Sequence, residues 1–107
     1  MPEVFKEVAA TGTLNHGHTV AGMTPTQLCA GFPCTKGVLI RAPGPDDAVP
    51  NYRAVWIGRK HVTADSAPGT GGYPLMPGAS IVLPIDDPSQ IYIVSDIEEQ
   101  EVSWIGA

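Results

Sequence analysis

The 107 residues are enough for one small domain, and 12 glycines with 11 prolines interrupt the chain too often for an architecture built from helices. Six lysines and arginines against eleven aspartates and glutamates give a net charge of −5, which argues against a protein that binds nucleic-acid phosphates. We therefore expect no nucleic acid as a partner. No apolar run is long enough to span a membrane or to form a signal peptide, so we expect no membrane as a partner either.

The N-terminal residues 1–22 are predicted to be an arm or edge strand followed by a loop. Residues 3–14 alternate without a cleanly apolar side, which suits an arm that lies on a partner. Its apolar residues Val4, Phe5 and Val8 are therefore candidate interface residues. Residues 15–22, NHGHTVAG, are mostly small and polar and predict a loop.

Residues 23–107 are predicted to form one β-sandwich domain. Short apolar runs rich in Val and Ile alternate with Gly and Pro turns, a pattern typical of strands. Between two of these runs, residues 66–78 are expected to form an ordered loop that lays Tyr73, Leu75 and Met76 against the sheet. With residues 3–14 there are about seven strands, so we expect an all-β fold, a small antiparallel β-sandwich or jelly-roll-like domain. The predicted strands are residues 24–30, 34–42, 52–59, 79–85, 91–95 and 102–105.

Two pairs of residues suggest metal or thiol chemistry. His16 and His18 would point the same way from an extended segment and could chelate a metal if symmetry added further ligands; the alternative is a solvated loop. Cys29 and Cys34 flank a four-residue turn, so a cross-strand disulfide is geometrically possible. A reducing cytosol would instead keep them as small buried thiols. We assign no metal site and expect no cofactor.

No constellation of residues points to catalysis. The acidic pairs Asp46-Asp47 and Asp86-Asp87 lie in proline-bounded turns, where carboxylates bond the local backbone. There is no G-x-S-x-G elbow, and the glycine-rich residues 69–72 lack the lysine and helix of a phosphate loop. We therefore expect no enzyme activity.

Aromatic side chains are the remaining candidates for binding. Trp56, Trp104, Tyr52, Tyr73 and Tyr92 could form a sugar-stacking platform or an interface anchor. The tryptophans could equally fill the sandwich core, Trp56 because its neighbours at period two are small. Trp104 lies near the C-terminus and must be held by the core or by a neighbouring subunit. Tyr73 and Trp104 are the interface candidates outside the arm.

From Val38 to Ile105, about two-thirds of the chain, the order of features resembles the small β-sandwich domains of tailed-phage virion proteins, especially capsid decoration (cement) and head-fibre proteins. The family pattern is a strand, then N-x-x-x-V-y-V-G, then GG-x-x-L-x-P-G-x-S, then further strands. The matching positions are Asn51, Val55, Ile57, Gly58, Gly71, Gly72, Leu75, Pro77, Gly78 and Ser80.

This resemblance implies a structural protein of the capsid outer surface, assembled in the host cytoplasm. It implies a homo-oligomer, commonly a trimer, that binds major capsid protein where subunits meet. It carries no catalytic residue across. Because tail-fibre and baseplate modules share the pattern, a receptor- or carbohydrate-binding module is the alternative.

Overall fold

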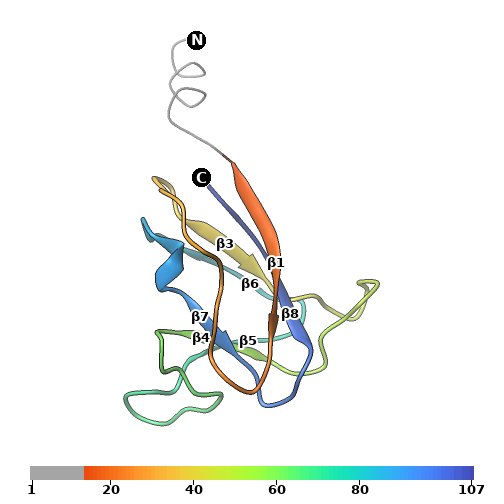
Figure 1. Cartoon of the computed structure of the whole chain (residues 1–107). Coiled ribbons are helices and arrows are strands. Elements are labelled where there is room, and N and C mark those ends of the chain that lie inside the picture. Colours follow the sequence, from red (N-terminus) through yellow and green to blue (C-terminus); the bar gives the residue numbers. More distant parts are fainter. Residues whose placement is uncertain (1–13) are drawn as a thin grey trace, which may run out of the picture.

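The computed structural model describes residues 14–107, which form eight short strands in two four-stranded antiparallel sheets (Figure 1). The prediction of a small all-β sandwich is thereby confirmed. The candidate interface residues Val4, Phe5 and Val8 lie outside the described residues.

Both sheets are assembled from strands that are mostly distant in sequence. The first sheet has the order β1-β8-β3-β6 and the second the order β2-β7-β4-β5. A 3₁₀ turn, η1 (Pro88–Gln90), precedes β7, and the Asp87 carboxylate caps it by accepting from the Ser89 backbone N–H. The strands are β1 (Asn15–Ala21), β2 (Thr26–Gln27), β3 (Val38–Arg41), β4 (Val55–Gly58), β5 (Tyr73–Leu75), β6 (Ser80–Leu83), β7 (Tyr92–Val94) and β8 (Gln100–Gly106).

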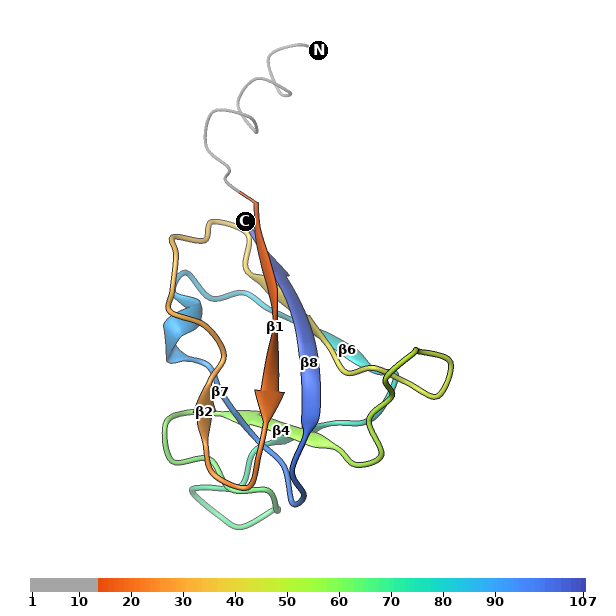
Figure 2. The same ribbon diagram turned by 45° about the vertical axis from the view of Figure 1, so that its right-hand side comes forward.

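The predicted loop at residues 15–22 is wrong, because residues 15–21 form strand β1. This strand pairs with β8 along its whole length, from Asn15 opposite Gly106 to Ala21 opposite Gln100 (Figure 2). Its polarity reflects its place at the edge of the first sheet, where one face meets solvent. The sandwich therefore includes residues 15–21, which the predicted boundary at residue 23 left out.

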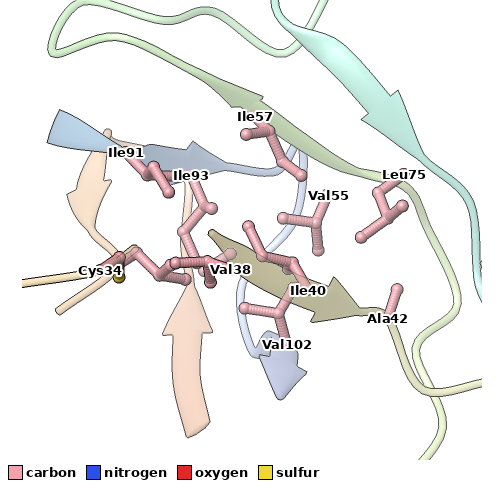
Figure 3. Packing of buried hydrophobic residues seen from close by; sticks show 12 residues of the cluster. Cys34, Val38, Ile40, Ala42, Val55, Ile57, Leu75, Ile91, Ile93 and Val102 are labelled. Carbon is pink, nitrogen blue, oxygen red and sulfur yellow. The ribbon is translucent and has the colours of Figure 1, made fainter. Parts of the chain in front are cut away.

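The core lies between the sheets and consists of alternate residues from both. Ile40 and Val102 of the first sheet meet Val55 and Ile93 of the second, and all four are fully buried (Figure 3). This alternation of buried and outward residues is what a half-buried strand requires. The free energy of burying these side chains holds the two sheets together.

Strand β4 shows which side of each sheet faces the core. Val55 and Ile57 are buried, so Trp56 between them points outward, and of the two roles that the sequence left open for Trp56, filling the core does not apply. The prediction that the 66–78 loop places its apolar side chains against the sheet is right for Leu75, which is buried. It is wrong for Tyr73 and Met76, which are exposed. Residues 73–75 are themselves the edge strand β5.

The glycine-rich connection from β4 to β5 is held by its own backbone. The Thr63 N–H donates to the Thr70 carbonyl, and the Gly72 N–H donates back to the Thr63 carbonyl. A Cβ on Gly71 would lie 2.5 Å from the Asp65 carbonyl oxygen, which explains why glycine stands there. The connection is an ordered loop, as predicted.

Candidate functional site

A sandwich of two open sheets has two sides where their edge strands face each other. On one side β1 faces β2, and on the other β6 faces β5. The first side is closed by side chains of the chain itself. The second is left open as an apolar groove, and this contrast defines the candidate site.

Trp104 closes the side at β1 and β2. Its ring stacks on Phe32 with the ring centres 5.8 Å apart, and its indole N–H donates to the Thr19 hydroxyl at 3.1 Å. The Thr19 hydroxyl in turn donates to the Leu28 carbonyl just after β2, which ties the two edges together. Trp104 is thus held by the core, one of the two possibilities that the sequence left open.

Gly17 makes room for this closure. A Cβ at Gly17 would lie 2.7 Å from the Trp104 ring, closer than packed atoms approach. Phe32 likewise covers Gly106, where a Cβ would lie 2.9 Å from the ring. The glycine that made residues 15–22 resemble a loop therefore lies directly under the ring of a partly buried aromatic pair.

The side at β5 and β6 stays open. Ile81, Leu83 and Ile85 point toward the core but are only partly buried, because no described residue covers them. They line a groove of about 380 Å³ whose far wall comes from β4, β5 and the two residues just before β7. The lining residues are Ile57, Gly58, Arg59, Tyr73, Ile81, Leu83, Ile85, Gln90 and Ile91.

Positive charge stands beside this apolar groove. Arg59 lines it, and Lys60 lines the adjoining hollow over the β4–β5 loop. Elsewhere arginines are paired: Arg41 with Asp47 at 3.0 Å, and Arg53 with Asp96. Within residues 14–107 neither Arg59 nor Lys60 forms an ion pair, so their charges are available to an anionic partner.

A second apolar surface crosses the outer face of the first sheet. Leu39 lies opposite Ile105 on one side and opposite Val82 on the other, so the three form one row across β8, β3 and β6. Their exposed fractions are 39%, 39% and 59%. Such a row on a sheet face is a surface on which a partner can bury apolar area.

His16 and His18 lie on this same outer face, as the period of two predicted. Both are exposed, and His18 Nδ1 is 3.3 Å from the Ser103 hydroxyl and 3.7 Å from a Glu101 carboxylate oxygen. No group of three or more side chains able to hold a metal gathers anywhere in residues 14–107. The pair therefore has no third ligand from the described part of its own chain.

Cys29 and Cys34 are free thiols, so the disulfide that their spacing allows is not formed in this structure. Cys34 belongs to the core cluster. Burial is the largest cause that raises the pKa of both thiols above the ordinary value. At neutral pH they stay protonated, which suits packing rather than redox or metal chemistry.

The acidic pairs serve the turns, as predicted for Asp47 and Asp87. Asp47 accepts from Arg41 and from the Gly44 N–H, and these bonds lower its pKa. Asp87 accepts from the hydroxyl and the N–H of Ser89, which lowers its pKa in the same way. The two carboxylates are committed to local structure.

The sequence reasoning missed the structural use of two buried amides. Asn51 bonds both the N–H and the carbonyl of Glu101, at 2.9 and 2.8 Å, and so continues the ladder of β8 where β3 has ended. Gln100 accepts from the N–H groups of Tyr52 and Arg53. The loop after β3 is thereby fixed to β8.

The groove was also missed. The alternation of Ile81, Leu83 and Ile85 marks one face of a strand, but no local signal shows that this face is left half covered. Of the predicted interface residues, Tyr73 lines the groove and Trp104 lies on the opposite, closed side.

No protein-family profile, curated protein or solved structure matches this chain. Among the described residues no helix is long and apolar enough to cross a membrane. The fold thus defines the class, a small antiparallel β-sandwich.

Proposed function

We propose that the chain is a structural virion protein, a capsid decoration (cement) protein that binds across junctions between major capsid protein subunits and stabilises the shell. It would sit on the capsid outer surface as a homo-oligomer, in the form of a trimer. The observation that carries the proposal is the pair of apolar surfaces, the groove and the outer row, on a sandwich whose loops are fixed by hydrogen bonds.

Such a protein acts by mass action. A ligand that binds the assembled state but not its separated subunits stabilises the assembly in proportion to its affinity and concentration. Several copies joined in one oligomer raise the avidity of individually weak contacts. Neither effect needs a catalytic group, and a rigid scaffold lowers the entropy lost on binding.

Co-sedimentation with shells tests the proposal. Purified full-length protein is mixed with shells of the major capsid protein from the same genome, and the bound fraction is measured against protein concentration. We expect saturable binding and a higher temperature of shell disassembly. Shells that bind no protein and disassemble at an unchanged temperature would contradict it.

Substitutions at the predicted interface residues of the arm make this shell-binding experiment more specific. Since β1 starts at Asn15, a deletion of residues 1–20 would remove part of the sheet, so substitutions are used. We expect the triple change Val4→Ser, Phe5→Ser and Val8→Ser to weaken shell binding strongly. The matched control is Val49→Ser, which removes a 66% exposed apolar side chain from the 43–50 loop.

One observation favours the alternative, a tail-fibre or baseplate module that binds a receptor carbohydrate. Tyr52 and the outward Trp56 line a shallow hollow of about 310 Å³ beside the Arg53–Asp96 ion pair. An aromatic face next to hydrogen-bonding groups is a surface on which a sugar ring can stack. A saturable change in tryptophan fluorescence with a glycan, lost in Trp56→Ala, would favour this function over capsid decoration.

A further inference from the structure

The four edge strands of the sandwich differ in how well they are protected against pairing with a further strand. Proteins shield exposed edges by keeping them short, by proline and by polar side chains. Strand β2 has only two residues, β5 has three with Pro74 at its centre, and β1 turns His16 and His18 outward. Strand β6, Ser80–Leu83, has neither a proline nor a charged residue and carries a single polar side chain. It is the least protected of the four edges.

Strand β6 is apolar on both of its faces, a pattern that strands in the middle of a sheet have. Ile81 and Leu83 point toward the core and line the groove, whereas Val82 points to the outer face and is 59% exposed. Within residues 14–107 only β3 pairs with β6. The two apolar surfaces of the molecule, the groove and the outer row, therefore meet at one unpaired edge.

The backbone of β6 directs hydrogen-bonding groups at this edge. Successive residues of a strand point their N–H and C=O groups alternately to one neighbouring strand and to the other. The Ala42 N–H donates to the Ala79 carbonyl just beyond the paired residues of β3 and β6, so the odd-numbered residues of β6 bond toward β3. Ser80 and Val82 therefore point their backbone groups to the free edge. A strand added there would satisfy these groups.

A second copy of β6 matches this edge when the two strands run antiparallel about Val82. Val82 then lies opposite the partner's Val82 on the outer face, and the two residues exchange N–H···O bonds. On the inner face Ile81 lies opposite the partner's Leu83, so every pair of facing side chains is apolar. Pairing with β1, the longest of the other edges, would instead place polar histidines beside Val82. The edge is therefore complementary to itself.

We infer that two copies of the free protein associate through β6, antiparallel about Val82, so that their first sheets join into one continuous sheet. Such a contact uses the same surface on both copies and closes as a dimer. The paired surface is small, so we expect a weak dimer that forms between micromolar and millimolar concentration. The inference goes beyond the proposed function and does not rest on it, because this twofold contact belongs to the free protein and the proposed trimer to the shell.

Sedimentation equilibrium and amide hydrogen exchange of the full-length protein test the pairing. We expect the mass to rise from one chain toward two with concentration, and exchange of the Val82 amide to slow in parallel. The control is the Val20 amide at the free edge of β1, where Glu101 opposite it bonds Asn51 instead; its exchange should not depend on concentration. A mass of one chain throughout would overturn the inference. Association without slower Val82 exchange would also overturn it, and a trimer of that kind would leave the proposed function intact.

A matched pair of substitutions supplies the second arm. Val82→Lys places two like charges opposite each other across the twofold axis, and we expect the association constant to fall about tenfold. Val20→Lys makes the same change at a 55% exposed valine on the other edge of the same sheet, and should leave association unchanged. Unchanged amide signals of Ile93 and Val102 confirm that each variant keeps its core. Undiminished association of Val82→Lys, or an equal loss in both variants, would contradict pairing through β6.

Discussion

Both sides of this sandwich carry apolar side chains between the edge strands, but only one side is closed by them. On the side at β1 and β2, Trp104 and Phe32 fill the space between the sheets, and a hydroxyl joins the edges. On the side at β5 and β6, three aliphatic side chains are left half covered beside Arg59 and Lys60, which form no ion pair with any residue of the described range 14–107. The first side stabilises the fold, whereas the second leaves apolar surface open to solvent.

The largest expected effect is on the closed side. Trp104→Ala removes the stacked ring and leaves a cavity, so we expect the free energy of unfolding to fall by about 3 kcal/mol. Urea denaturation followed by circular dichroism measures it. The control is Ile105→Ala on the next residue, whose side chain faces outward and whose loss should cost much less. Equal losses in the two variants would show that Trp104 does not close the core.

Gly17→Ala tests the packing of the same closed side, at the residue on β1 that contacts the Trp104 ring. The new methyl group overlaps the Trp104 ring, and we expect a loss of about 2 kcal/mol from overpacking. In the Trp104→Ala background the ring is gone, so the added cost of Gly17→Ala should nearly vanish. Additive losses in the double variant would mean that Gly17 is required for another reason.

Changes on the open side should cost less. Ile81→Ala removes a partly buried side chain, for which we expect a loss of about 1 kcal/mol, below that of Trp104→Ala. Its control is Val82→Ala, the next residue, which is 59% exposed. A loss as large as that of Trp104→Ala would mean that the groove is as fully packed as the closed side.

The smallest effect is that of pH. Hydrogen bonds from Arg41 and Arg53 lower the folded-state pKa of Asp47 and Asp96 below the ordinary value of about 3.9. Groups of this kind stabilise the fold above their unfolded pKa, and the contribution is lost as the pH falls through the folded pKa. Stability should therefore decline only below about pH 4.

Asp47→Asn and Asp96→Asn should each flatten this decline, as followed by urea midpoints between pH 2 and pH 7. The effect is small because both ion pairs are exposed to solvent. A decline that starts near neutral pH would point to a different titrating group.

Much of the fold could be predicted because each strand carries its own alternation. Ile40, Val55 and Ile93 sit in runs whose period of two already places them inside, and the Pro and Gly turns mark where strands end. Strand β1 could not be predicted in this way. Gly17 is required there because the Trp104 ring leaves no room for a Cβ, and Thr19 accepts a hydrogen bond from the Trp104 indole. Trp104 lies 85 residues from Thr19 in the sequence, so no local pattern shows either contact.

The candidate site was harder still. The sequence drew attention to Tyr73, which lines the groove, and to Trp104, which is committed to the core. It gave no sign of Arg59 beside Ile81 and Ile85, because that neighbourhood arises only when the two sheets pack. Whether a face of a strand is fully covered depends on the strands opposite, and no local pattern records it.

The proposed function requires that the genome encoding this chain also encodes a virus particle, and electron cryomicroscopy of that particle is its most direct test. Capsid decoration predicts density for an eight-stranded sandwich on the outside of the shell, over junctions between capsid subunits and in symmetric groups of three. A shell without that density, or the same sandwich found only on a tail fibre, would contradict it.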